Sequence, residues 1–177
     1  VDLWTSCFTP RALRLLAAEP RNHAYLNLKA NVLGRAGDHV RAIEAFESVL
    51  ADYPSNPRIW MAYGDALKTA GRTGDGIAAY RRSLALAPGF GEAWWSLANL
   101  KTVHFAAADL EAMQSQLARS DIAADDRLHL HFALGKALED ADQYALSFSH
   151  YAEANRLRRA TIAYDATVIT EYVRRAR

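Results

Sequence analysis

The hydrophobic residues of this chain recur at the spacing of one helix face. Trp60, Tyr63 and Leu67 lie three or four positions apart, and Tyr80 and Leu84 repeat that spacing after a short glycine-containing stretch. Positions separated by three or four residues lie on the same side of an α-helix, whereas alternate positions share one face of a strand. The pattern therefore predicts two amphipathic helices joined by a tight turn.

The stretch between these helices contains Gly71, Gly74 and Gly76, a pattern that also occurs in phosphate-binding loops. A loop of that kind follows a β-strand and opens a helix. Here the preceding segment has helical spacing, so we interpret Gly71 as the left-handed residue that ends the first helix. Gly76 is expected inside the second helix, where Gly76→Ala should stabilise the fold by about 0.5–1 kcal/mol.

The predicted hairpin recurs along the chain with a period of thirty-four residues. Small, aromatic and proline positions each recur in kind, which helical periodicity alone does not produce. The matching sets are Pro20, Pro54 and Pro88; Leu16, Leu50 and Leu84; Leu26, Trp60 and Trp94; Ala30, Gly64 and Ala98; and Gly37 and Gly71. The chain is therefore predicted to be an array of helix-turn-helix repeats.

These positions resemble the pattern of the tetratricopeptide repeat (TPR) family, which runs W-x-x-L-G-x-x-Y, then A-x-x-x-F, then a proline. The matching residues of one repeat are Trp60, Tyr63, Gly64, Leu67, Gly76, Tyr80 and Pro88. The resemblance implies an all-α fold, a right-handed α-solenoid of antiparallel helix-turn-helix repeats with a C-terminal capping or linker helix.

The repeat pattern predicts a single solenoid domain over residues 1–177. Its expected parts are a partial repeat at 1–22, repeats at about 23–56, 57–90, 91–127 and 128–160, and a capping or linker helix at 165–177. Gly135 matches Ala98 at a distance of thirty-seven residues rather than thirty-four. The third repeat is therefore expected to be longer and irregular.

Composition narrows the class of protein. The chain has 177 residues, of which 51% are hydrophobic and 23% charged, with a formal net charge of +1. These values suit a folded domain and provide no global field to recruit nucleic acid. No segment has the apolar length of a membrane helix, and we find no secretory signal. With the single cysteine, Cys7, this leads us to expect a cytoplasmic protein without nucleic-acid or membrane partners.

Residues 92–177 resemble a more specific group, the N-terminal repeat region of bacterial TPR-sulfotransferases. The similar phrases are "AWWSLANLKTVHF", "DDRLHLHFALGKALEDADQYALSFSHYAEANRLRRATIAYDA" and "EYVRRAR". The resemblance implies a parent protein whose catalytic α/β domain follows Arg177 and uses 3′-phosphoadenosine 5′-phosphosulfate. No strand-loop-helix unit that could cradle this donor is found in the chain itself. We therefore expect this chain to bind no cofactor and to be no enzyme.

Two groups of residues suggest chemistry at first sight. His129 and His131 lie two positions apart, which separates them by about 200° around a helix, so they cannot share a metal ion. Glu139, Asp140 and Asp142 resemble an acidic pair for general acid–base catalysis but fall at a predicted helix end. We interpret them as a solvated turn and expect no metal site and no catalytic residue.

The C-terminal part of the chain is basic. Six arginines follow position 155, against two acidic residues, a local charge of +4. These arginines are Arg156, Arg158, Arg159, Arg174, Arg175 and Arg177. The charge suits a phosphate or an acidic peptide. The simpler interpretation is a solvated helix face with favourable charge near helix C-termini.

The TPR resemblance also implies where a partner would bind, because the first helices of successive repeats line the concave surface in that family. The candidate groove residues are Asn27, Asn31, Met61, Asp65, Lys68, Trp95, Asn99, Phe132 and Lys136. Trp95 either stands exposed in the groove, where tryptophan is a common hot-spot residue, or packs between repeats. Asparagine pairs with extended backbone. Some members of the family hold the terminal carboxylate of a peptide with basic residues in this groove. In this chain Asn27, Met61 and Trp95 occupy positions where such a basic residue would stand.

The primary prediction is a protein- or peptide-binding scaffold. The alternative is a non-catalytic region that presents an acceptor to an adjoining sulfotransferase domain.

Overall fold

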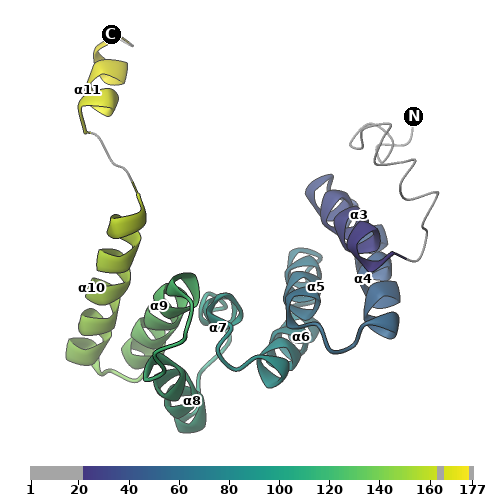
Figure 1. The fold of residues 1–177 in the computed structure, drawn as a ribbon, viewed down its shortest axis with the longest axis horizontal. Coiled ribbons are helices and arrows are strands. Elements are labelled where there is room, and N and C mark those ends of the chain that lie inside the picture. Colours follow the sequence, from purple (N-terminus) through teal and green to yellow (C-terminus); the bar gives the residue numbers. More distant parts are fainter. Residues whose placement is uncertain (1–21, 163–165, 176–177) are drawn as a thin grey trace. The chain divides into compact units, whose positions relative to one another are not determined.

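The structure is a computed structural model that describes residues 22–162 and 166–175. These residues form α-helices joined by short connections, and none of them lies in a strand, which confirms the predicted all-α class (Figure 1). The helices are α3 (His23–Arg35), α4 (His39–Asp52), α5 (Pro57–Thr69), α6 (Thr73–Leu86), α7 (Gly91–Ala98), α8 (Ala107–Leu117), α9 (Ala124–Asp140), α10 (Tyr144–Thr161) and α11 (Ala166–Arg175). Apart from Asn22, the predicted partial repeat lies outside the described residues.

The chain forms two compact units, Val1–Val103 and His104–Arg177. The boundary falls inside the predicted third repeat, where α7 and α8 have 8 and 11 residues. The helices of the two preceding pairs have 13 or 14 residues each. The repeat boundaries within a single solenoid domain remain a prediction.

In the first unit, consecutive helices pack against each other from α3 to α7. The buried side chains at the centre come from α3 to α6 and include Ala30, Phe46, Leu67 and Ala79. Each of these residues has at most 2% of its surface exposed. Burial of apolar surface at roughly 25 cal/mol per Å² is the main force that holds such a stack together.

Two tryptophans that recur in the sequence make the same contact in the structure. The indole Nε1 of Trp60 donates a hydrogen bond of 2.8 Å to the carbonyl of Pro54. Trp94 makes the same bond, also 2.8 Å, to Pro88. Each bond ties the first helix of a repeat to the connection that precedes it, which gives the recurring tryptophan a structural role.

The turns within the helix pairs have the left-handed geometry that the sequence predicts. Gly37 and Gly71 have φ angles of +85° and +81°. After Gly71, the N–H of Arg72 donates to the carbonyl of Leu67 at 2.9 Å. This six-residue closure is the Schellman motif, which glycine favours because it has no Cβ. In the second unit Asp142 takes the same place with a φ of +58°.

The structure shows a close contact that opposes the expected stabilisation by Gly76→Ala. Gly76 is buried inside α6, as predicted, but α5 passes close to it. A Cβ on Gly76 would lie 3.1 Å from the backbone oxygen of Gly64 and 3.4 Å from the backbone nitrogen of Lys68. Helix propensity favours alanine here, but the methyl group would require the neighbouring backbone to shift by a few tenths of an ångström.

In the second unit, α8 packs against α9 and α9 packs against α10. The hydroxyl of Ser147 donates to the backbone oxygen of Gly135 at 2.7 Å. The ring of Tyr151 lies so close to Gly135 that an added Cβ would stand 2.8 Å from Cδ1. The α9–α10 hairpin is therefore as tightly packed as α5–α6 in the first unit.

Candidate peptide-binding surface

Two of the predicted groove residues, Asn31 on α3 and Asp65 on α5, line one cleft of the first unit. The cleft, here called the α3–α5 cleft, has a volume of about 180 Å³. Its other lining residues are Ala30, Gly34, Arg35, His39, Phe46, Ala62, Ala66 and Thr69. A second hollow of about 450 Å³ shares Asn31 and Arg35 with it and adds the predicted residue Asn27.

The polar groups of the cleft are held by neighbouring side chains. Asn31 Nδ2 donates to the backbone oxygen of Asn27 at 2.8 Å. Asp65 Oδ1 accepts from Lys68 Nζ at 3.1 Å and from the hydroxyl of Tyr80 at 2.7 Å. Burial, followed by the hydrogen bond to Asp65, raises the pKa of Tyr80 above its usual value. Tyr80 therefore stays protonated and keeps Asp65 in place.

Tyrosine–carboxylate bonds of this type recur between helices. Tyr63 on α5 donates to Glu47 on α4 at 2.7 Å. Burial and this bond raise the pKa of Tyr63 to about 12. Tyr151 donates to Glu139 Oε2 at 2.8 Å within the α9–α10 hairpin. Each bond orients a carboxylate at a helix–helix junction.

The cleft contains three polar residues that were not predicted from the sequence, Arg35, His39 and Thr69. Arg35 lies one helical turn beyond Asn31, and Thr69 lies one turn beyond Asp65, so a longer stripe of the same spacing would have found both. His39 begins α4. Its Nδ1 is buried and has no hydrogen-bond partner. The groove residues were predicted along the first helices of the repeats, so that prediction could not include a residue at the start of α4.

The remaining groove candidates lie away from this cleft. Met61 is partly buried on α5, and Trp95 is partly buried on α7. Asn99 is the exposed C-cap of α7. Phe132 and Lys136 belong to α9 in the second unit. There, Phe132 packs on the Tyr151 ring with centroids 6.4 Å apart, and Lys136 pairs with Asp140.

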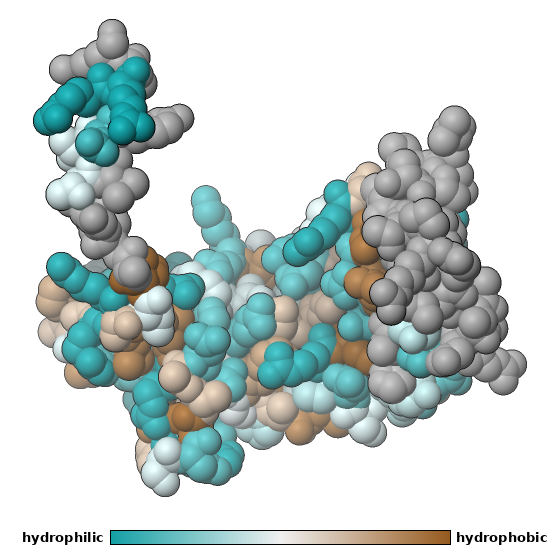
Figure 2. All heavy atoms as spheres, turned by 45° about the horizontal axis from the view of Figure 1, so that its top comes forward, coloured by the Kyte–Doolittle hydropathy of each residue, from teal (hydrophilic) through white to brown (hydrophobic). Residues whose placement is uncertain are grey.

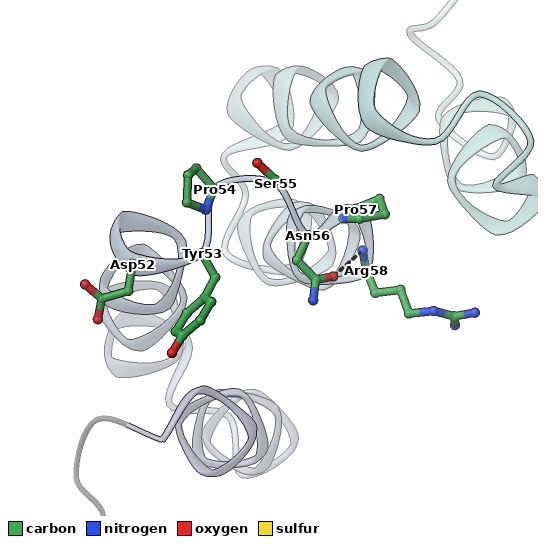
Figure 3. Close-up of a pocket in the computed structure, with 7 residues that line it drawn as sticks. All are labelled: Asp52, Tyr53, Pro54, Ser55, Asn56, Pro57 and Arg58. Atoms are coloured by element: carbon green, nitrogen blue, oxygen red, sulfur yellow. Dashed lines mark hydrogen bonds between the residues drawn. The ribbon is translucent and has the colours of Figure 1, made fainter.

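A larger hollow, about 610 Å³, lies at the connection between α4 and α5 (Figure 3). The Tyr53 and Asn56 side chains lie on one side of this loop, and Pro54 and Ser55 on the other. Asn56 Oδ1 accepts from the backbone N–H of Arg58 at 3.0 Å, which caps the start of α5. The Arg58 guanidinium stands 5.3 Å from the centre of the Phe90 ring. These polar groups therefore serve the local fold.

The acidic residues suspected of catalysis have separate partners. Glu139 accepts from Tyr151, Asp140 from Lys136, and Asp142 from Tyr144. The three carboxylates therefore bond to three different residues, as expected for side chains at a helix end and its turn. Among residues 22–162 and 166–175, no group of three or more His, Cys, Asp or Glu side chains is placed to hold a metal ion.

Part of the C-terminal positive charge is neutralised within its own helices. Arg156 makes two bonds of 2.7 Å to Glu153, and Arg175 lies 3.8 Å from Glu171. Arg158 and Arg159 are exposed on α10. Arg177 lies outside the described residues.

On the face drawn in Figure 2, hydrophobic side chains form small patches between polar ones. Within the described part of the chain, no helix is both long and apolar enough to cross a membrane.

Two overlapping segments of the chain match a known family model. Residues 10–57 and 27–89 match the family model described as "Tetratricopeptide repeat". Residues 10–89 are therefore similar to tetratricopeptide repeats, over somewhat less than half of the chain. The α3–α5 cleft lies between the first helices of the two predicted repeats within this matched part of the chain. No curated protein matches the chain.

Solved structures of MamA share the fold. One, "Crystal structure of MamA", superposes with a TM-score of 0.60 at 16% identity and covers 86% of this chain and 88% of that one. The MamA 41-end structure from Desulfovibrio magneticus RS-1 has a TM-score of 0.56 at 20% identity and covers 82% of this chain and 80% of that one. At these identities the likeness concerns the fold alone. The resemblance of residues 92–177 to TPR-sulfotransferases remains a prediction.

Proposed function

We propose that this chain is a scaffold whose TPRs bind an extended segment of a partner protein along α3 and α5. The α3–α5 cleft carries the proposal, because polar side chains from two helices converge there around a small apolar floor. Protein binding is the role that the TPR fold supports. Peptide selection with cleft variants tests whether the partner binds on the concave surface.

The polar groups suit an extended backbone. Asn27, Asn31 and Arg35 follow one another at intervals of four residues on α3, so they form a row along one side of the helix. Asn31 is exposed, and its amide offers both donor and acceptor groups to a peptide bond. Asp65 and Thr69 form a parallel row on α5, and Thr69 Oγ1 donates to the Asp65 carbonyl at 2.8 Å.

The floor of the cleft allows a close approach. Ala30, Gly34, Ala62 and Ala66 line it. Small side chains leave room for a peptide backbone, and Phe46 provides a buried apolar base. The volume of about 180 Å³ is of the order of one side chain rather than of a cofactor. A peptide that lies across the cleft and inserts one side chain fits this shape.

The test is a selection of random peptides against the immobilised chain. Enriched peptides are titrated by fluorescence anisotropy against the chain, the double variant Asn31→Ala/Arg35→Ala, and the control variant Glu44→Ala/Arg82→Ala. The control residues are exposed on α4 and α6 and do not line the cleft. We expect the cleft variant to weaken binding at least about tenfold and the control to leave it unchanged. Equal affinities, or no enrichment at all, would contradict the proposal.

The alternative role rests on the sequence resemblance of residues 92–177. In that role the repeats present an acceptor to an adjoining sulfotransferase domain, and this chain itself binds no 3′-phosphoadenosine 5′-phosphosulfate. Calorimetry with the donor and this chain tests the second statement, and sulfuryl transfer by the parent protein tests the first. Transfer activity in the parent would favour the alternative. A cytoplasmic location is part of both proposals.

A further inference from the structure

The two helices of the α9–α10 hairpin are joined by a pair of histidines. Nδ1 of His131 on α9 lies 3.0 Å from Nδ1 of His150 on α10. The ring centroids are 5.1 Å apart, and the ring planes are inclined by 40°. Both side chains are partly buried, so the pair lies at the edge of the helix interface and within reach of solvent.

Both histidines differ in type from the residues at the corresponding positions of the α5–α6 hairpin. His131 corresponds to Trp60 in the α5–α6 hairpin, seventy-one residues earlier, and His150 corresponds to Ala79. There the tryptophan bonds to the Pro54 carbonyl, and the alanine is 2% exposed. In α9–α10 an aromatic and a small residue are thus replaced by two imidazoles that face each other. Core packing alone does not need a histidine at both positions.

The distance between the two nitrogens suits a common metal ion. Imidazole nitrogens bind transition metals at about 2.0–2.1 Å. Two such ligands at an angle between about 90° and 109° are roughly 2.9–3.4 Å apart, which covers square-planar and tetrahedral geometries. The separation of 3.0 Å falls inside this range. The two nitrogens are therefore already at the separation that a shared ion requires, and rotation of the rings would aim their lone pairs at it.

The surroundings favour unprotonated rings. Burial lowers the pKa of both His131 and His150, and the proximity of His150 lowers that of His131 further. Arg127 and Arg156 act in the same direction on His131, and Glu153 acts against them. Both arginines are engaged elsewhere: Arg127 donates to two backbone carbonyls, and Arg156 pairs with Glu153. Neutral imidazole is the form that binds a metal ion.

We propose that His131 and His150 form a two-imidazole site for a divalent transition-metal ion of the Cu²⁺, Ni²⁺ or Zn²⁺ class. The ion links α9 to α10, and its other coordination positions are open to water or to a ligand from another molecule. No third metal ligand is placed beside the pair among the described residues. The nearest carboxylate on the same turn of α10, Glu153, is occupied by Arg156. This proposal does not depend on the peptide-binding role.

The first test is calorimetric titration of Cu²⁺ into tag-free protein in a buffer that does not bind metals. Cys7→Ser serves as the background, because a thiolate elsewhere in the chain would also bind the ion. His131→Gln and His150→Gln are compared with His129→Gln. His129 lies on the same helix two residues away, and its Nδ1 contacts the Asp125 carbonyl at 2.8 Å. We expect one ion per chain, with affinity reduced about tenfold or more by His131→Gln and His150→Gln and unchanged by His129→Gln.

A second measurement requires no substitution in the hairpin. In the unsubstituted chain, Zn²⁺ is titrated while the imidazole resonances are followed by nuclear magnetic resonance. We expect the rings of His131 and His150 to shift together and to saturate near one equivalent, while His129 does not respond. The proposal is overturned if the two rings do not respond together, or if His129→Gln weakens Cu²⁺ binding as much as the other two variants.

Discussion

The ring of Tyr80 occupies the space where Gly64 would carry a side chain. A Cβ on Gly64 would stand 2.6 Å from Cε1 of Tyr80 and 2.7 Å from Cδ1. The tyrosine cannot move away freely, because its hydroxyl is bonded to Asp65 and none of its surface is exposed. The small residue and the aromatic residue of the TPR pattern are therefore two halves of one contact.

Gly64→Ala should destabilise the first unit by about 1–3 kcal/mol, because the added methyl group must displace a fixed ring. The measurement is urea unfolding followed by circular dichroism. Gly74→Ala is the matched control. Gly74 lies in α6 with nothing within 4 Å of its Cβ position, so alanine there should be neutral or stabilising by up to about 1 kcal/mol. A loss of stability in the control equal to that of Gly64→Ala would contradict the contact.

Gly76→Ala should destabilise by about 1 kcal/mol despite the higher helix propensity of alanine. The steric reason is the backbone oxygen of Gly64, which cannot rotate away as a side chain can. Ala42 occupies the corresponding position of the preceding repeat, where it is fully buried. Ala42→Gly should therefore destabilise as well, through lost burial and added chain entropy. An increase in the urea midpoint for Gly76→Ala would show that α5 and α6 can separate at little cost.

Asp142→Gly should stabilise the α9–α10 hairpin by about 0.5–1 kcal/mol. Asp142 has a φ of +58° in the turn where Gly37 and Gly71 stand in the first unit. A residue with a Cβ is strained in the left-handed region, and glycine is not. The substitution also removes the bond from Tyr144, which is exposed and contributes little. Gly71→Asp tests the same geometry in reverse and should lower the melting temperature.

The histidine pair should make stability depend on pH in the acidic range. The folded state holds the pKa of His131 and His150 below the usual value near 6.5, so the unfolded chain binds protons more readily. Stability is therefore complete above pH 6.5 and is lost as the pH falls below it. Arg127 and Arg156 reinforce the effect on His131, and Glu153 opposes it. Thermal melts between about pH 7.5 and pH 5 should show this loss.

His131→Gln, which cannot be protonated, is the control for this dependence. Its melting temperature should fall less over the same pH range than that of the unsubstituted chain. His129→Gln should leave the dependence unchanged, because His129 has a backbone partner and lies outside the pair. Parallel curves for all three proteins would show that the pair does not control acid stability.

Local patterns determined the features of this protein that depend on neighbours in sequence. Helical spacing, the repeat period of thirty-four residues and the turn glycines Gly37 and Gly71 were all readable, since each reflects a preference of the backbone within a few residues. The same patterns located Asn31 and Asp65, which lie on predicted helix faces and line one cleft.

The tertiary structure decided what lies opposite each face. In the sequence Gly76 is an ordinary helical position. In the structure an added Cβ would lie 3.1 Å from the backbone oxygen of Gly64 on α5. In the sequence His131 lies two positions from His129. In the structure its Nδ1 contacts Nδ1 of His150, nineteen positions away. Such contacts depend on the distance and angle at which two helices pack. Those quantities are set by the sum of many side-chain contacts and not by the spacing within either helix.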